Sequence, residues 1–276
     1  MPSQPTVTTL TVQGVEIPKL GFGTWEITGH DATEAVRDAL ELGYRHIDTA
    51  RAYGNEAEVG RGLADSGVDR GDVFLTTKLW YSRLRPAEVR EQLEGSLRDL
   101  ATDYVDLLLI HWPNPAVALA QTLHAMSELC GEGKVRQLGV SNFPSALLRE
   151  ALEVAPVIAD QVEYHPYLAQ PELLALARER DLLLTAYSPF AHGRLLDDAV
   201  LREVGDAHGK SAGQVVLRWL LDQPQVAAIP KASSHGNRAA NLEVFDFELS
   251  DEERGRIASL AREGRTTNPS WAPRWD

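Results

Sequence analysis

Eight short apolar segments, each followed by a helical pattern, dominate this 276-residue chain and limit what it can fold into. Segments such as "VFLTTK" and "YVDLLLI" are rich in aliphatic and β-branched residues, which is typical of strands buried on both faces. Consecutive strand–helix units produce parallel strands joined by right-handed crossovers. Eight units within about 250 residues predict an α/β fold, a closed (β/α)8 TIM barrel.

A doubly wound open sheet is the alternative arrangement of such units. It usually carries a full G-x-G-x-x-G after its first strand, whereas "GFGTWE" supplies only Gly21 and Gly23, a weak match. Before this segment, "TVTTLTVQGVEIPKL" reads as two short strands around Gln13 and Gly14. This pattern predicts an N-terminal β-hairpin.

The helical patterns have recognisable ends. One helix is expected to begin at Asp31, where Asp31 and Glu34 fit a capping box, and the last is expected near Asn241. The chain contains no linker or low-complexity segment, so residues 1–276 are predicted to form a single domain. The tail "TTNPSWAPRWD" is predicted to be a loop over the active-site face, with a frayed terminus as the alternative.

The amino-acid composition limits the kinds of binding partner and the cellular compartment that we expect for this protein. Lys and Arg total 27 against 40 Asp and Glu, a net charge of −13, which disfavours nucleic acid as a partner. No apolar run approaches the roughly 18–20 residues that span a bilayer, so no membrane association is expected. "MPSQPTVTTL" lacks a basic segment followed by an apolar block, so we expect no secretory signal. Cys130, the only cysteine, is predicted to be a buried thiol on a helix face, and this cysteine usage fits a reducing cytoplasm.

Polar residues stand at the ends of seven of the eight predicted strands. They are Asp48, Lys78, His111, Ser141 with Asn142, Gln161, Tyr187 and Lys231. A barrel carries its active site at the C-terminal ends of its strands. Any one of these residues, Gln161 for example, could be a satisfied polar group, but a full ring at one face indicates a functional site.

The residue types at this ring suggest a reaction. Tyr53 follows Asp48 in a small-residue loop, and a tyrosine pKa near 10 is too high for efficient proton donation at neutral pH. Lys78 could lower that pKa, Asp48 could hold the lysine, and His111 could bind a substrate oxygen. This set suits protonation of a carbonyl oxygen while a hydride arrives, and a hydride requires a nicotinamide cofactor. The alternative is that the tyrosine is ordinary packing and the lysine–aspartate pair is structural.

Seven motifs in order then identify a resemblance: "GYRHIDTARAYGNEAEVG", "TTKLW", "DLLLIHWP", "GVSNF", "DQVEYHP", "AYSPF" and "IPK". Together they resemble the aldo-keto reductase family from Gly21 to about Leu249, that is, over essentially the whole chain. The resemblance implies a (β/α)8 barrel that binds NADP(H) in extended form. The short segment between His111 and Leu119 is similar to the bacterial branch that includes 2,5-diketo-D-gluconate reductases.

The resemblance and the residues together give a complete set of expected site residues. The catalytic residues are Asp48, Tyr53, Lys78 and His111. The cofactor-binding residues are Gly23, Thr24, Ser141, Asn142, Gln161, Tyr187, Ser188, Phe190, Lys231, Ser233, Arg238 and Asn241. The substrate pocket is expected to contain Trp25, Trp80, Trp112 and Trp271, and no metal is expected.

One departure concerns the cofactor phosphate. Many relatives carry an arginine six residues after the phosphate-binding lysine, but that position is Asn237 here and Arg238 follows it. One residue rotates a helical side chain by about 100°. We expect Lys231 to contribute most to binding a 2′-phosphate and Arg238 less; the alternative is that both pair with surface carboxylates.

These observations predict a monomeric, cytoplasmic NADPH-dependent carbonyl reductase that acts on small molecules. The alternative within the same fold is a non-catalytic NADP(H)-binding regulatory barrel, although all four catalytic positions are intact. A metal-dependent barrel hydrolase is the rival enzyme. Such enzymes often need two histidines separated by one residue on the first strand, and the eight histidines here include no such pair.

Overall fold

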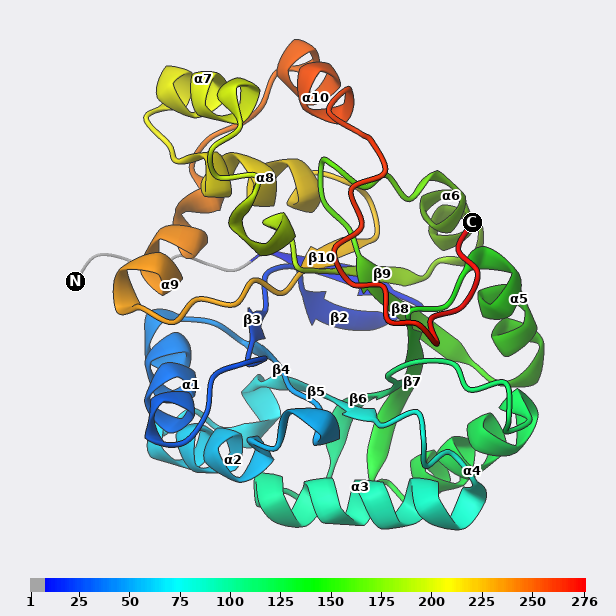
Figure 1. Cartoon of the computed structure of the whole chain (residues 1–276). Coiled ribbons are helices and arrows are strands. Elements are labelled where there is room, and N and C mark those ends of the chain that lie inside the picture. Colours follow the sequence, from blue (N-terminus) through cyan, green and yellow to red (C-terminus); the bar gives the residue numbers. More distant parts are fainter. Residues whose placement is uncertain (1–7) are drawn as a thin grey trace.

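The centre of the protein is a curled sheet of eight parallel strands, seen in a computed structural model that describes residues 8–276 (Figure 1). Each strand lies beside its neighbours in the sequence, in the order β3 to β10. The strands are β3 (Phe22–Gly23), β4 (His46–Asp48), β5 (Phe74–Leu79), β6 (Val105–Ile110), β7 (Val135–Ser141), β8 (Val157–Glu163), β9 (Leu183–Tyr187) and β10 (Val226–Ala228). The predicted parallel order is therefore confirmed.

The two ends of this sheet approach each other. Leu20 and Ala228 form a parallel bridge, and the Gly21 amide donates to the Ala228 carbonyl at 2.9 Å. A Cβ atom placed on Gly23 would lie 2.7 Å from the Ile229 carbonyl oxygen, so only glycine allows β3 to pass this close. The sheet thus curls like a barrel.

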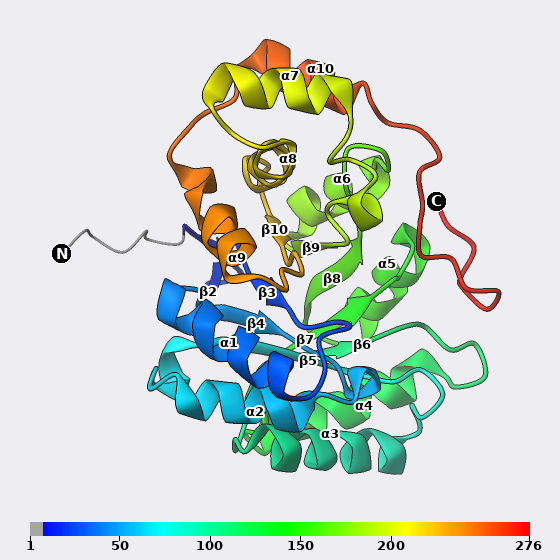
Figure 2. The same cartoon turned by 60° about the vertical axis from the view of Figure 1, so that its left-hand side comes forward.

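Helices surround the sheet on its outer side (Figures 1 and 2). They are α1 (His30–Leu42), α2 (Glu56–Asp65), α3 (Pro86–Leu100), α4 (Leu119–Gly131), α5 (Ser145–Val154), α6 (Pro171–Arg180), α7 (Ala199–His208), α8 (Ala212–Leu221), α9 (His235–Leu242) and α10 (Asp251–Ala258). Helix α3 shows the packing principle, because Val89, Leu93 and Leu97 recur at helical spacing and are all buried. None of the helices within residues 8–276 has the length and apolar character needed to cross a bilayer.

Two helix predictions were wrong in detail. Helix α1 begins at His30 with Gly29 as its N-cap and no side-chain cap, so Asp31 and Glu34 do not form a capping box. Glu34 instead pairs with Arg37 one turn further on. Helix α10, after the predicted last helix, was missed although Ser250 and Glu253 form the capping box there.

The predicted hairpin is present as β1 (Thr9–Val12) and β2 (Val15–Pro18), joined through Gln13 and Gly14. Both turn residues have positive φ, 47° and 82°, as a tight two-residue hairpin turn requires. The first two residues of the predicted stretch, Thr6 and Val7, lie outside the described residues. Val12 and Ile17 of the hairpin pack with Phe74 and Leu107 of the sheet in one buried cluster. Cys130, predicted as buried, is half-buried against the outer core.

Candidate active site

The two-residue period of the strands carries the predicted polar residues into the interior of the sheet. Leu109 and Ala159 belong to the interior apolar cluster that the hairpin covers. His111 and Gln161 come two residues later along the same strands, so their side chains point to the same side. Both line one cavity, which lies at the C-terminal ends of the strands.

Lys78 is the centre of a buried polar network at the base of this cavity. Its Nζ donates to Asp48 Oδ1 at 2.5 Å, to the Thr49 carbonyl at 2.9 Å and to Tyr53 Oη at 3.2 Å. Gln161 Nε2 donates to the other oxygen of Asp48, at 2.7 Å. The lysine and the aspartate are fully buried, so their charges neutralise each other away from water.

Burial and charge act in opposite directions on these groups. Burial raises the pKa of the Tyr53 phenol more than the Lys78 ammonium lowers it, and Asp48 adds to the increase. The expected net decrease in the tyrosine pKa is therefore absent, and the phenol holds its proton at neutral pH. Burial acts to lower the pKa of Lys78, but Asp48 and Tyr53 outweigh it, so the lysine pKa is raised and the ammonium stays charged.

His111 lies beside the tyrosine as a neutral ring. Its ring centroid is 5.7 Å from that of Tyr53, with the planes at 74°. Burial and, after it, the Lys78 charge hold the pKa of His111 well below its ordinary value. Its Nδ1 is buried and has no hydrogen-bond partner. A neutral imidazole can either donate or accept one hydrogen bond at this position.

The strand ends on the other side of the cavity are fixed by a chain of hydrogen bonds. Tyr187 Oη donates to Asn142 Oδ1 at 2.7 Å, and Asn142 Nδ2 donates to the His111 carbonyl at 3.0 Å. Ser141 Oγ donates to the Gln161 carbonyl at 2.8 Å. Asn142 adopts a left-handed backbone conformation with φ of 63°. Asn142, Gln161 and Tyr187 therefore present side chains of fixed orientation to the cavity.

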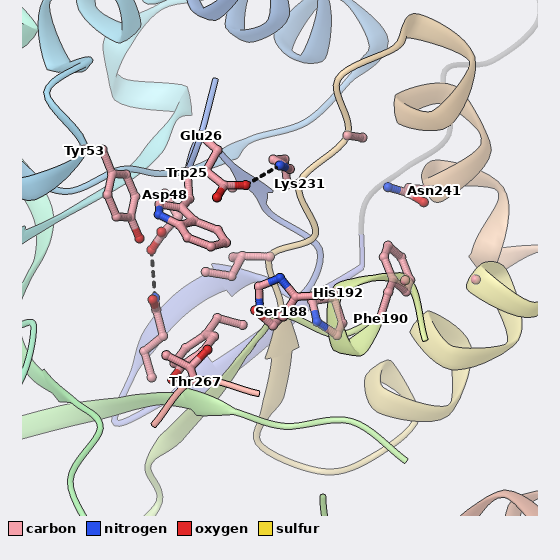
Figure 3. Close-up of a pocket in the computed structure, with 18 of the residues that line it drawn as sticks. Trp25, Glu26, Asp48, Tyr53, Ser188, Phe190, His192, Lys231, Asn241 and Thr267 are labelled. Carbon is pink, nitrogen blue, oxygen red and sulfur yellow. Dashed lines mark hydrogen bonds and ion pairs between the residues drawn. The ribbon is translucent and has the colours of Figure 1, made fainter. Parts of the chain in front are cut away.

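The cavity has a volume of about 840 Å³ and extends from Tyr53 and His111 to Lys231 and Asn241 (Figure 3). That volume lies within the usual range for small-molecule and cofactor sites, about 300–1,000 Å³. Fourteen predicted site residues line it: Gly23, Trp25, Asp48, Tyr53, Trp80, His111, Trp112, Asn142, Gln161, Tyr187, Ser188, Phe190, Lys231 and Asn241. Six others lie outside its lining: Thr24, Lys78, Ser141, Ser233, Arg238 and Trp271.

The cations predicted to bind phosphate both have carboxylate partners. Lys231 Nζ lies 2.9 Å from Glu26 Oε2, and Figure 3 shows this pair among the residues that line the cavity. Arg238 is buried and donates to Asp38 Oδ2 at 2.6 Å, away from the cavity lining. Asn237 lines the cavity in its place.

Aromatic rings surround the end of the cavity near Tyr53. Trp80 and Trp112 line it, and Trp271 of the C-terminal tail packs edge-on against both. Trp271 also stacks on Tyr81, with centroids 4.1 Å apart and planes at 11°. In Figure 1 the tail (red) crosses the ends of β8 and β9 on its way to α5. The tail is a loop at this face of the sheet, as the sequence predicts.

The sequence analysis missed several residues that line the cavity. They include Glu26, His192, Ser211, Gly213 and Thr267. Ser211 carried a usable signal, because it forms a capping box with Gln214 at the start of α8, and helix N-termini attract anions. His192 stands in a strained loop with φ of 53°, and no motif marked it.

The residues of this cavity fit a dinucleotide. Amide and aromatic groups gather at one end, and Lys231 lies at the other with Asn237 and Asn241 of α9. Residues 8–276 contain no group of three or more His, Cys, Asp or Glu that could hold a metal ion.

Comparisons with known proteins agree with this geometry. A model of the aldo/keto reductase family matches residues 19–262. A glyoxal reductase of Bacillus subtilis (strain 168) is 41% identical over 256 residues, covering 91% of this chain and 92% of that protein. The methylglyoxal reductase DkgB of Escherichia coli O157:H7 is 36% identical over 266 residues, with 94% and 99% coverage. A crystal structure described as "a putative 2,5-diketo-D-gluconic acid reductase B" superposes with a TM-score of 0.96 at 43% identity, covering 99% of each chain.

Proposed function

The chain belongs to the aldo/keto reductase family and is an oxidoreductase, and from this premise we propose that it reduces aldehydes or ketones to alcohols with NADPH. Carbonyl reduction is supported by the activities in the names of its relatives. In this proposal Tyr53 is the general acid. The bound nicotinamide supplies the hydride.

The observation that carries the proposal is the hydrogen bond from Lys78 Nζ to Tyr53 Oη at 3.2 Å. The same ammonium also donates to Asp48. The ammonium stabilises the phenolate that forms when Tyr53 gives its proton to the carbonyl oxygen. The buried Asp48 keeps the lysine charged and oriented. The neutral His111 donates a hydrogen bond to the same oxygen, and the tryptophans around it exclude water.

We assign the nicotinamide contacts to the end of the cavity beside Tyr53 and His111, where Gln161 is bonded to Asp48 and Asn142 to the His111 carbonyl, and the phosphate contacts to the end at Lys231. In this proposal Asn142 and Gln161 would bind a carboxamide and Tyr187 would stack on a flat ring, which is supported by the presence of all three in the cavity lining. Lys231 would bind the 2′-phosphate, and its present ion pair with Glu26 would break when it does so. Arg238 would support that region from behind through its bond to the Ala232 carbonyl, 2.9 Å.

The proposal extends to the architecture. The bridge between Leu20 and Ala228 supports a closed (β/α)8 barrel, and the family match to residues 19–262 supports one domain over residues 1–276. The cytoplasmic location and the monomeric state stay predictions.

The test is oxidation of NADPH by the purified chain with methylglyoxal, glyoxal, an aromatic aldehyde, a keto acid and a sugar-derived ketone. We expect turnover with at least the small dicarbonyls and a weaker rate with NADH. A chelator should leave the rate unchanged. Binding of NADPH without turnover of any carbonyl compound would instead favour the regulatory barrel.

A further inference from the structure

Glu163 is a buried carboxylate at the end of β8 that the proposed reaction does not use. It lies two residues beyond Gln161 on the same side of the strand, and its side chain is fully buried. Its oxygens accept from the Thr266 amide at 2.7 Å, from the Thr267 amide at 2.8 Å and from the Thr266 hydroxyl. His165 Nε2 lies 2.9 Å from Oε1. The carboxylate therefore joins the strand to the C-terminal tail.

Burial of this carboxylate requires these partners. A buried charge is costly unless it is well hydrogen-bonded. Burial acts to raise the pKa of Glu163, but the bonds from His165 and from Thr266 and Thr267 lower it further than burial raises it. The group is thus a carboxylate at neutral pH, and two successive tail amides converge on it. Charge-assisted bonds of this kind are about twice as strong as neutral ones.

The bonded tail residues lead directly into the wall of the cavity. Thr267 lines the cavity, as Figure 3 shows. Four residues later, Trp271 packs on Trp80 and Trp112, two of the rings that line the same cavity. The tail is also held by hydrogen bonds from Ser145 to the Asp276 carboxylate. These bonds are exposed to solvent and lie at the C-terminal end of the tail. Of these two attachments of the tail, the buried hydrogen bonds to Glu163 are the ones next to the cavity.

We propose that Glu163 is a positioning residue that holds the tail from Thr266 to Trp271 in place, so that Thr267 lines the substrate cavity and Trp271 packs on its rings Trp80 and Trp112, and that it thereby sets which carbonyl compounds fit. It acts through the tail and touches neither the substrate nor the proposed proton donor. The kinetic consequence rests on the proposed function; the anchoring of the tail does not.

Two variants and one control test this inference. Glu163→Gln keeps the size but turns one acceptor oxygen into a donor that faces the tail amides. Thr266→Val removes one hydroxyl donor and leaves the backbone amides in place. Asp106→Asn is the control, because Asp106 is a buried carboxylate that pairs with Arg70 and Arg136, both at 2.8 Å, and it does not line the cavity.

The first measurement is KM and kcat for methylglyoxal and for a bulky aromatic aldehyde, with the Kd of NADPH. We expect Glu163→Gln to raise the KM for the bulky substrate roughly tenfold, the equivalent of one charge-assisted bond. Thr266→Val should shift it in the same direction by less. The NADPH Kd and the kcat for methylglyoxal should stay within about twofold, and Asp106→Asn should lower Tm without changing the substrate ranking.

The second measurement is limited trypsin digestion, read by mass spectrometry at Arg265 and Arg274 in the tail. Glu163→Gln and Thr266→Val should speed cleavage at these two sites, and Asp106→Asn should not do so selectively. Unchanged tail cleavage in Glu163→Gln, or an equal change in KM for both substrates, would overturn the inference. If the wild type reduces no carbonyl compound, the proposed function fails, and the digestion still decides whether Glu163 anchors the tail.

Discussion

Replacement of Tyr53 by phenylalanine should abolish carbonyl reduction while leaving the cofactor site intact. The variant removes only the hydroxyl, which is the longest of the three contacts of Lys78 at 3.2 Å; the bonds to Asp48 at 2.5 Å and to Thr49 at 2.9 Å remain. The lysine therefore stays paired and charged. The fold should lose about 1 kcal/mol, the usual net value of one hydrogen bond.

The expected effect on the rate is much larger. A positioned general acid contributes about 10²–10⁴-fold, which corresponds to about 2.7–5.5 kcal/mol of transition-state stabilisation. The assay is steady-state reduction of methylglyoxal with saturating NADPH, together with fluorescence titration of the cofactor. We expect kcat to fall by that factor and the NADPH Kd to stay within about twofold.

The control is Tyr164→Phe, which removes a buried hydroxyl bonded to Gln223 at 2.7 Å, outside the cavity lining. It should leave kcat unchanged. Because the pKa of Tyr53 is raised above its ordinary value near 10, the wild type should keep its proton donor through neutral pH and lose activity only in strongly alkaline buffer. Retention of more than about a tenth of the wild-type kcat in Tyr53→Phe would refute its role as the acid.

Three further predictions follow from other parts of the structure. Lys231→Ala should weaken NADPH binding by about 1.5–3 kcal/mol, or ten- to a hundredfold in Kd, and Arg238→Ala by less; equal losses for NADH in a fluorescence titration would show that the lysine does not read the 2′-phosphate. Deletion of Asn268–Asp276 should change KM and substrate ranking more than NADPH affinity, and unaltered kinetics across several substrates would contradict this. Burial raises the pKa of Asp160 well above its ordinary value. The Asp160 carboxyl therefore stays protonated in the native state, whereas the unfolded chain releases this proton above about pH 4. The free energy of unfolding then falls as the pH rises. Asp160→Asn should accordingly raise Tm more at pH 8 than at pH 5 in thermal melts, and a larger gain at pH 5 would refute the assignment.

The parts of the fold that follow from local patterns could be predicted from the sequence. Eight alternating units are enough to predict eight parallel strands, because such crossovers allow few other arrangements. The polar residues at the strand ends were also predictable, since the two-residue period carries Leu109 to His111 and Ala159 to Gln161 on one face. The misplaced start of α1 shows the limit: Asp31 matches a capping motif, but the chain enters that helix through Gly29.

Contacts between residues far apart in the sequence could not be predicted in this way. Arg238 is near Lys231 in the sequence, yet it turns toward Asp38 of α1, which lies 200 residues earlier. Glu163 looked like part of a motif, and its partners Thr266 and Thr267 are more than 100 residues away. Local periodicity gives the direction of a side chain relative to its own element. The partner it meets depends on how separate elements pack.

The buried ion pair of Lys78 and Asp48 has an energetic cost that bears on the function of the site. Both side chains are fully buried, and removing two charges from water costs several kcal/mol per ion before their attraction is counted. A pair of apolar residues of similar volume often stabilises a fold equally well or better. The curled sheet has an apolar interior in Phe74, Leu109 and Ala159, which an apolar pair in place of Lys78 and Asp48 would extend. In the proposed reaction this ion pair has a use that an apolar pair could not supply, because a fixed positive charge 3.2 Å from Tyr53 Oη would stabilise the phenolate that forms when the phenol gives up its proton.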